Sequence, residues 1–255
     1  MVRGLEIFRS FFKEYTGNYV LIGGAACDEH ISEAGLTFRA TKDLDIMLII
    51  ETLHAEFIAR FWEFIKAGGY GEKQKSQRER KYYRFMKPLN AAYPEQVELF
   101  ARQPDLLDLP DDAHLTPIPV VEDISSLSAI LMYADYYHFA IANSEVAGNL
   151  HRVTIKGLIC LKAKAFLNLT AAKEQGEKID ERDIKKHKND VIRLAVLLTD
   201  EDSLILPDSI GADIHQFMLA LEQDPPDFRT IAHNMGLPDL DPETVMNQIH
   251  LTFHI

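Results

Sequence analysis

The chain lacks the features that mark secreted, disulfide-bonded and membrane-spanning proteins. Its two cysteines, Cys27 and Cys160, lie far apart and have no metal-ligand spacing, which argues against a disulfide framework and a cysteine-rich zinc site. No apolar run approaches the roughly 20 residues that a membrane helix needs, and the first residues carry no secretory signal pattern. We therefore expect reduced thiols and a cytoplasmic location.

Basic residues are nearly absent from the last quarter of the chain. Residues 200–255 contain eleven acidic residues and one basic residue, Arg229. This segment carries most of the formal net charge of -12, and the rest of the chain is close to neutral. Because nucleic acids are polyanions, we expect this acidic segment to face away from any RNA or to contact a protein instead.

The remaining composition is typical of a folded globular protein. The 255 residues are 47% hydrophobic and 26% charged, which is close to the average for soluble domains, and the length suits one large or two modest domains. Strand and helix patterns alternate in the first half, whereas helical patterns dominate the second. We predict an α+β protein with a small mixed sheet flanked by helices at residues 1–121, followed by a mainly helical domain at residues 122–255.

Hydrophobic periodicity and turn residues locate the expected elements. The first half predicts strands at residues 19–22, 44–50, 81–86 and 96–100, and helices at residues 25–34 and 54–66. The second half predicts helices at residues 154–169, 183–198, 209–221 and 242–249, the first with Thr154 as its N-cap. Residues 127–153 are ambiguous, because residues 133–141 are rich in residues that favour strands and a turn is indicated near Asn143. Trp62 fits the core face of its predicted helix.

A basic stretch runs from Glu72 to Lys87, with seven basic residues against two acidic ones. One interpretation is a solvated hairpin or loop of mixed charge. The other is a surface that faces the phosphates of a nucleotide or of RNA. The sequence leaves both interpretations open.

The segment that carries chemistry combines a glycine pair with two aspartates. Gly23-Gly24 follows the first predicted strand and opens a helix, so backbone N–H groups, including that of Ala25, can approach a phosphate closely. Asp43 and Asp45 stand at i and i+2 on a later strand, which places both carboxylates on one face. Two like charges side by side favour a divalent cation such as Mg²⁺, which prefers oxygen ligands. Taken singly, the aspartates also fit a polar strand entry, and the glycines an ordinary tight turn.

This arrangement resembles the DNA polymerase β-like nucleotidyltransferase superfamily, whose signature is a glycine pair or Gly-Ser, a helix, and Asp-x-Asp on the next strand. In that superfamily the two aspartates bind metals and a third carboxylate lies on a neighbouring strand. The resemblance implies that this third carboxylate is Glu98, where aspartate is commoner, with Glu95 as the alternative. It also implies Mg²⁺ or Mn²⁺ as the cofactor and an NTP as a substrate.

Within the superfamily, the chain is similar to the AbiEii-like abortive-infection toxins over roughly residues 19–198. The segment from Arg39 to Asp45, with the sequence Arg-Ala-Thr-Lys-Asp-Leu-Asp, is similar to their Arg-x-Thr-x-Asp-φ-Asp element, where φ is an apolar residue. The resemblance implies that Thr41 and Lys42, which directly precede Asp43 in this element, contribute to nucleotide binding.

Two further elements of the resemblance lie on predicted helices of the second half. The segment 161–165 is similar to the family's lysine-bearing helix, and the segment 188–192 to its Arg/Lys-Asp element. The resemblance implies that Lys162 contacts the triphosphate or the departing pyrophosphate, and that Asp190 orients Lys162 or the acceptor. The helical pattern independently places Lys162 in the apolar stripe of its helix, where a lysine must snorkel or meet an anion. Asp190 also fits a surface ion pair with Lys186.

The leading hypothesis is therefore a metal-dependent nucleotidyltransferase whose active site lies between the two domains. Asp43 and Asp45 would bind two Mg²⁺ ions, and Glu98 would share one of them and could accept the proton of the attacking hydroxyl. The branch implies an RNA or tRNA end as acceptor, as in a type IV toxin paired with an antitoxin protein. The alternatives are a small-molecule acceptor, as in antibiotic-modifying relatives, a protein hydroxyl, or a non-catalytic nucleotide-binding or interaction module.

Overall fold

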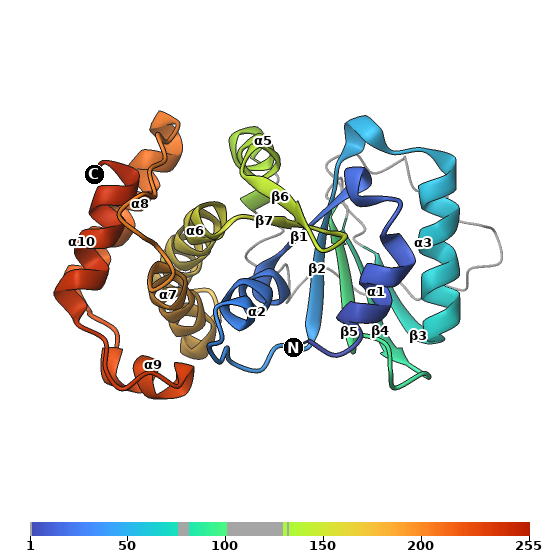
Figure 1. Ribbon diagram of the computed structural model, residues 1–255, viewed down its shortest axis with the longest axis horizontal. Helices are drawn as coiled ribbons and strands as arrows, with labels where there is room; N and C mark the ends of the chain where they lie inside the picture. The colour runs from blue at the N-terminus through green and yellow to red at the C-terminus, as the bar shows by residue number, and fades with distance from the viewer. Residues whose placement is uncertain (1, 76–81, 101–129, 132) are drawn as a thin grey trace. The chain divides into compact units, whose positions relative to one another are not determined.

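The computed structural model describes residues 2–75, 82–100, 130–131 and 133–255 (Figure 1). The chain forms two compact units that interleave along the sequence. Unit 1 comprises Met1–Ala26, Ala40–Met132 and Ser144–Val153, and unit 2 comprises Cys27–Arg39, Tyr133–Asn143 and Thr154–Ile255. The predicted boundary between residues 121 and 122 lies outside the described residues.

Within the described residues, unit 1 contains a mixed sheet of seven strands in the order β3-β4-β5-β2-β1-β7-β6. The strands are β1 (Tyr19–Ile22), β2 (Asp43–Leu48), β3 (Tyr70–Lys75), β4 (Tyr82–Pro88), β5 (Gln96–Phe100), β6 (Ser144–Ala147) and β7 (Leu150–Val153). β2 pairs antiparallel with β1 and parallel with β5, so it is a central strand. Leu44, Ile46 and Leu48 lie on one face of β2 and are buried, and Met47 on the other face is buried too.

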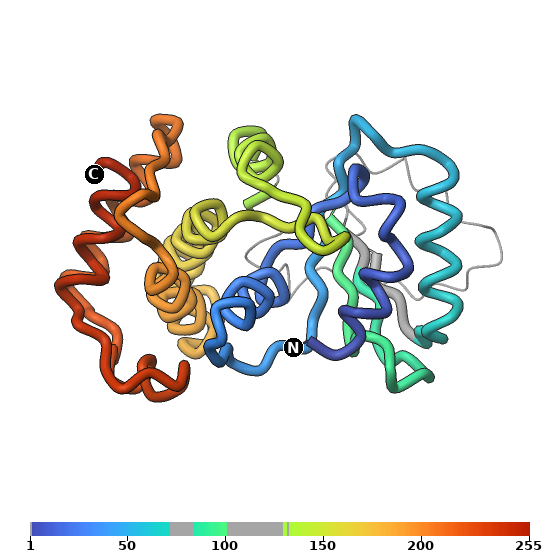
Figure 2. The backbone as a smooth tube through the Cα atoms, viewed as in Figure 1, coloured from blue at the N-terminus to red at the C-terminus, as the bar shows by residue number. Residues whose placement is uncertain are grey.

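Helices α1 (Leu5–Phe12) and α3 (Ala55–Gly68) belong to unit 1 and run side by side in Figure 2. They pack through aromatic rings, and the Phe64 ring lies 5.7 Å from the Phe8 ring, centroid to centroid. α3 follows its N-cap His54, which accepts a hydrogen bond from the Phe57 N–H, and its C-cap is Gly69, whose φ is 62°. Two short 3-10 helices, η1 (Thr16–Asn18) and η2 (Ile50–Thr52), flank β1 and β2. The predicted place of Trp62 in the core is confirmed.

Unit 2 is helical throughout its regular elements. Helix α2 (Gly23–Glu33) begins in unit 1 and continues into unit 2. The other helices are α5 (Ala134–Ala142), α6 (Ile155–Glu174), α7 (Glu181–Ala195), α8 (Asp208–Gln223), α9 (Phe228–Met235) and α10 (Pro242–Phe253). α6 packs against both α7 and α8. The N-cap prediction for α6 is confirmed, because the Thr154 hydroxyl accepts a hydrogen bond from the Gly157 N–H.

The fold class is α+β, as predicted, and several elements differ from expectation. Residues 133–141 do not form a strand but lie mostly in α5, whose buried residues Tyr136, Tyr137, Phe139 and Ala140 follow helical spacing. β6 and β7 add a hairpin to the sheet, although both fall in the range expected to be mainly helical. Their turn residues, Gly148 and Asn149, both have positive φ, as a type I′ hairpin turn requires. β3 and α9 were not predicted.

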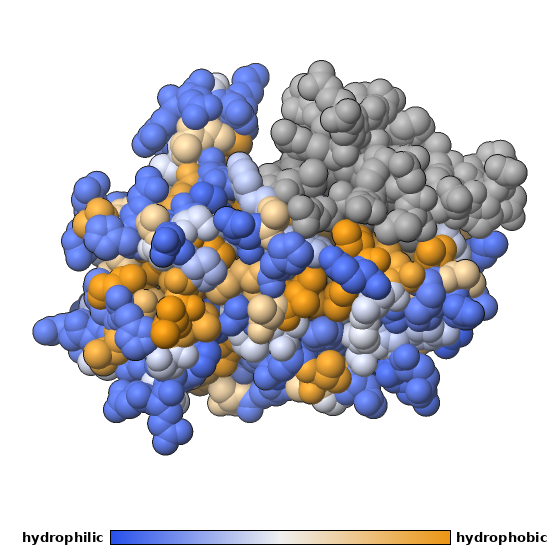
Figure 3. Space-filling view, turned by 90° about the horizontal axis from the view of Figure 1, so that it is seen from above, coloured by the Kyte–Doolittle hydropathy of each residue, from blue (hydrophilic) through white to orange (hydrophobic). Residues whose placement is uncertain are grey.

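A membrane-spanning helix is not found among the described residues, because none of their helices combines enough length with enough apolar character. Hydrophilic and hydrophobic residues are interspersed over the face seen in Figure 3. Both cysteines are buried, and neither forms a disulfide. Burial raises the pKa of the Cys160 thiol, which keeps it protonated and unreactive at neutral pH.

Candidate active site

Asp43 and Asp45 lie on the same face of the central strand β2. Both are partly exposed, whereas the alternating residues Leu44 and Ile46 are buried. This is the arrangement that the period of two in a strand predicts. The strand therefore presents two carboxylates together at its N-terminal end.

Glu98 lies directly beside Asp45 on the neighbouring parallel strand. In the register of β2 and β5, Asp45 is opposite Glu98 and Asp43 is opposite Gln96. Partners in register point to the same face of a sheet. The prediction that Glu98 lies on a strand next to the aspartates is thus confirmed, and the sheet brings all three carboxylates to one face.

An arginine that sequence analysis did not assign to the site holds Glu98. Arg84 on β4 is opposite Glu98 in the antiparallel register, and its Nε donates to Glu98 Oε1 at 2.7 Å. Gln96 Nε2 donates to the same oxygen at 2.7 Å. The side chains of Arg84 and Glu98 are only 10% and 3% exposed. One member of the basic stretch 72–87 therefore points to a carboxylate of the site and not to solvent.

Two of the three carboxylates on the acidic face are suited to a divalent cation. Among the described residues, no group of three or more His, Cys, Asp or Glu side chains is arranged to hold a metal ion. Mg²⁺ is commonly held by one or two carboxylates together with substrate phosphates, and Asp43 and Asp45 supply that number. Glu98 is engaged by Arg84 and Gln96, so it does not complete a three-carboxylate cluster in this arrangement.

Gly23 brings the start of α2 against Asp45. Gly23 has φ of 69°, a left-handed conformation, and a Cβ built on it would lie 1.9 Å from Asp45 Oδ2. Ile22, the last residue of β1, is opposite Asp45 in the sheet register. The backbone at Gly23, Gly24 and Ala25 therefore opens a helix beside a site aspartate, and a helix N-terminus favours anions.

Replacement of Gly23 by alanine tests this close approach. We expect Gly23→Ala to lower the free energy of unfolding by roughly 2–4 kcal/mol, because the left-handed backbone and the contact with Asp45 both add strain. Gly35→Ala is the matched control: Gly35 has φ of 75°, but its Cβ would meet nothing within 4 Å. It should cost only about 1 kcal/mol. Equal losses in urea unfolding followed by circular dichroism would contradict the proposed contact.

Thr41, Lys42 and Glu95 lie next to the ends of these strands. Thr41 and Lys42 directly precede β2, and Lys42 Nζ lies 3.2 Å from Glu95 Oε2. The side chains of Lys42 and Glu95 are 69% and 49% exposed, so this is a surface ion pair. Glu95 precedes β5 and is not on the strand, which favours Glu98 as the third carboxylate.

Lys162 and Asp190 form a buried ion pair in unit 2. Lys162 Nζ lies 3.2 Å from Asp190 Oδ2, and the side chains are 1% and 0% exposed. Arg39 binds the same carboxylate through two hydrogen bonds, Nε to Oδ1 at 2.9 Å and Nη2 to Oδ2 at 2.7 Å. Arg193 Nη1 donates to Oδ1 at 3.0 Å. The anion that Lys162 meets in the structure is therefore Asp190.

Three cations surround the carboxylate of Asp190. Burial alone would raise the pKa of Asp190, but Lys162, Arg39 and Arg193 outweigh burial and hold this pKa well below its usual range. Burial and the adjacent Lys162 lower the pKa of His187, so this histidine is neutral at pH 7. The alternative interpretation of Asp190, a surface ion pair with Lys186, is wrong, because Asp190 is fully buried. Lys186 instead lies 3.7 Å from Asp183.

The predicted site residues thus fall into two groups. Gly23, Asp43, Asp45 and Glu98 come together in unit 1, whereas Lys162 and Asp190 come together in unit 2. Sequence analysis missed Arg84 in the first group. It gave no role to Arg39 or Arg193, although Arg39 belongs to the same sequence element as the aspartates.

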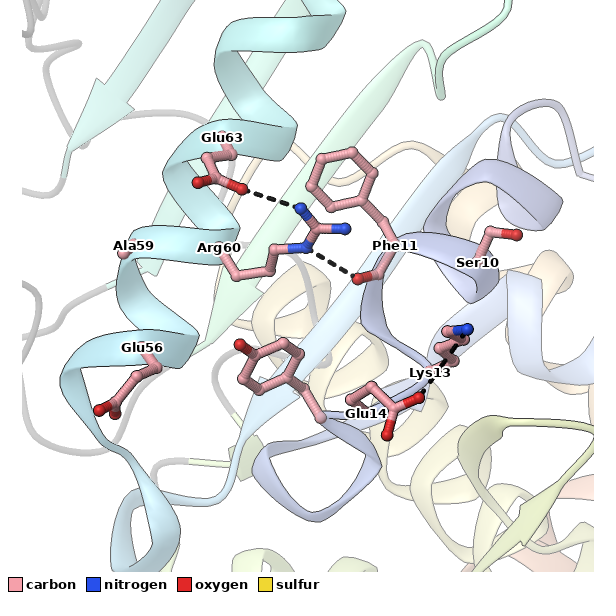
Figure 4. A pocket seen from close by; sticks show the side chains of 9 residues that line it. Ser10, Phe11, Lys13, Glu14, Glu56, Ala59, Arg60 and Glu63 are labelled. Atoms are coloured by element: carbon pink, nitrogen blue, oxygen red, sulfur yellow. Dashed lines mark hydrogen bonds and ion pairs between the residues drawn. The ribbon is translucent and has the colours of Figure 1, made fainter.

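A groove in unit 1 lies apart from these residues. It has a volume of about 460 Å³ and is lined by residues of α1 and α3 and of the segment that follows α1 (Figure 4). Arg60 lies over the Phe11 ring at 3.7 Å from its centroid, donates to the Phe11 carbonyl and pairs with Glu63. None of the predicted site residues lines this groove, so we interpret its contacts as packing between the two helices.

Comparison with known proteins gives no independent assignment. A scan against protein-family models finds no match to this chain. A search of curated proteins finds no match either.

Proposed function

We propose that the protein is a metal-dependent nucleotidyltransferase that moves a nucleoside monophosphate from an NTP to a hydroxyl acceptor in the cytoplasm. The observation that carries the proposal is the acidic face of the sheet, where Asp43, Asp45 and Glu98 lie on two adjacent strands. The start of α2 adds a phosphate-binding element beside Asp45. We infer from the same features that unit 1 is a polymerase β-like catalytic domain.

The donor set of the acidic face suits Mg²⁺ or Mn²⁺. Asp43 and Asp45 would hold the ion, since both are partly exposed carboxylates on one face of β2. A bound divalent cation would neutralise phosphate charge and lower the pKa of the acceptor hydroxyl. Its presence would also relieve the repulsion between the two aspartates.

The chain's own groups supply the remaining chemistry. Backbone N–H groups at Gly24 and Ala25 would bind phosphate oxygens of the NTP, with the positive end of the α2 dipole behind them. Glu98 would accept the proton of the attacking hydroxyl, because it lies next to Asp45 on the same face. The bond from the acceptor oxygen to the α-phosphorus would form as pyrophosphate leaves.

Lys162 and Asp190, both in unit 2, would support nucleotide binding indirectly. Both are almost fully buried and bind each other, so we propose that they contribute by fixing Arg39 and the helices around it. Arg39 stands four positions before Asp43 in the chain. Its partly exposed side chain is the member of this cluster that solvent or a ligand can reach.

The acceptor proposed is an RNA end such as that of tRNA, in line with the toxin-like sequence resemblance. The acidic residues 200–255 would then face away from the RNA or bind a protein such as an antitoxin. The basic stretch 72–87 would face RNA phosphates, although its residues 76–81 lie outside the described residues. A small-molecule hydroxyl, as in antibiotic-modifying enzymes, is the alternative acceptor.

A second candidate function is a non-catalytic nucleotide-binding or interaction module. One observation favours it: Arg84 and Gln96 both bind Glu98 Oε1, and the described residues contain no assembled three-ligand metal group. A lapsed enzyme would keep the scaffold and bind an NTP without transferring it. Transfer and binding must therefore be measured separately.

The test is label transfer from each of the four α-phosphate-labelled NTPs into total bacterial RNA, with Mg²⁺ present. We expect labelled RNA with the wild-type protein, and none when EDTA replaces Mg²⁺ or when Asp43→Asn is used. The labelled band would identify the acceptor by its size. Mg²⁺-dependent NTP binding without labelled RNA would redirect the proposal to a small-molecule or protein acceptor, and NTP binding without transfer to any of them would favour the lapsed module.

A further inference from the structure

Arg84 is the one described cation that the sheet register places opposite a site carboxylate. It sits on β4 opposite Glu98, which in turn sits on β5 opposite Asp45. The three residues therefore form a row across three adjacent strands. A positive charge at one end of this row lies on the same face as the proposed metal ligands.

The contact between Arg84 and Glu98 is built into the core of unit 1. The Nε to Oε1 distance is 2.7 Å, and both side chains are buried. A buried carboxylate needs a compensating charge, and a buried guanidinium needs an acceptor. Arg84 therefore supplies a counter-charge to Glu98 through Oε1.

We propose that Arg84 is a positioning residue that competes with the divalent cation for Glu98 and thereby sets the metal affinity of the site. This inference rests on the proposed function, because it takes the acidic face to be a metal site. Without metal, Arg84 supplies the counter-charge that lets three carboxylates occupy one face. A bound divalent cation would compete with Arg84 for the Glu98 carboxylate. The arginine thus holds metal affinity below the value that three carboxylates alone would give.

The first test measures Mn²⁺ binding to the full-length metal-free protein by calorimetry. We expect Arg84→Met to bind Mn²⁺ roughly tenfold more tightly than wild type, since a nearby positive charge and a competing partner are removed. The same variant should have a lower melting temperature without metal, and Mn²⁺ should restore more of it than in wild type. Arg84→Lys, which keeps the charge, should stay within about threefold of the wild-type affinity.

Arg60→Met is the matched control for the loss of a packed arginine. Arg60 belongs to the same unit and also pairs with a glutamate, Glu63, but it lies on α3 away from the carboxylates. It should lower the melting temperature without changing Mn²⁺ affinity. If Arg84→Met does not fold, Arg84→Gln replaces it, since glutamine keeps a donor for Glu98 without the charge.

The outcomes separate this inference from the proposed function. Wild-type protein that shows no Mn²⁺ binding dependent on Asp45 would overturn both the metal site and the role of Arg84. Normal Mn²⁺ binding with unchanged or weaker affinity in Arg84→Met would overturn only the role of Arg84, leaving it a structural ion pair. Tighter binding in Arg84→Met but not in Arg60→Met would support the proposal.

Discussion

Asp45→Asn should reduce nucleotidyl transfer by roughly a thousandfold or more, because it removes one of the two carboxylates proposed to hold the metal. The stability of the folded protein should change much less than the transfer rate. Asp43 and Asp45 are like charges on one face of β2, and loss of one charge relieves their repulsion. We therefore expect the free energy of unfolding without metal to fall by no more than about 1 kcal/mol, or to rise.

Glu95→Gln provides the matched control for Asp45→Asn. Glu95 is a carboxylate of the same unit that lies near β5 but is exposed and paired with Lys42. Its replacement should leave transfer within about threefold of wild type. The measurement is label transfer at saturating NTP and Mg²⁺, alongside urea unfolding of each variant. If folded Asp45→Asn transferred label at the wild-type rate, the proposed mechanism would be wrong.

Asp190→Ala should give the largest loss of stability. The substitution leaves Lys162, Arg39 and Arg193 without the carboxylate that all three contact. Removing one partner from a buried ion pair typically costs about 3–5 kcal/mol, because the remaining charge stays buried. A cost of this size approaches the total stability of many domains. We expect the variant to be insoluble or to unfold at much lower urea concentration.

Asp183→Ala is the control on the same helix. Asp183 is also an aspartate of α7 that pairs with a lysine, but its side chain is 57% exposed and lies 3.7 Å from Lys186. Loss of this surface pair and of a negative charge in the first turn should cost less than about 1 kcal/mol. Asp190→Asn, which keeps hydrogen-bonding capacity, should be intermediate. Similar unfolding curves for Asp190→Ala and Asp183→Ala would contradict the assigned role of Asp190.

Sequence patterns predicted the elements whose signals are local. β1 and β5 were predicted at their observed bounds, since each is a short run rich in apolar residues next to turn-forming residues. The shared face of the acidic pair on β2 also follows from alternation within a single strand, whereas the place of Glu98 on a neighbouring strand was implied by the family resemblance. Lys162 was recognisable as a buried cation because it interrupts an apolar helical stripe.

Features that depend on contacts far apart in the chain were not predictable in the same way. Arg39 and Asp190 are separated by 151 positions, and no local pattern pairs them. Arg84 was counted in a basic stretch because its partner becomes clear only from the strand register. β6 has the sequence Ser-Glu-Val-Ala, in which no apolar alternation marks a strand. The aromatic residues of α5 favour a strand by propensity, but the segment forms a helix because that places its apolar residues on one buried side.

The interleaving of the two units also has a consequence for how the chain matures on the ribosome. β1 pairs with β2 on one side and with β7 on the other, and β7 begins only at Leu150. At ordinary translation rates, β7 emerges on the order of ten seconds after β1. During that interval β1 is an open edge with unpaired backbone groups, which is a template for aggregation. The nascent protein should therefore depend on chaperone protection until the last strand of the sheet has been made.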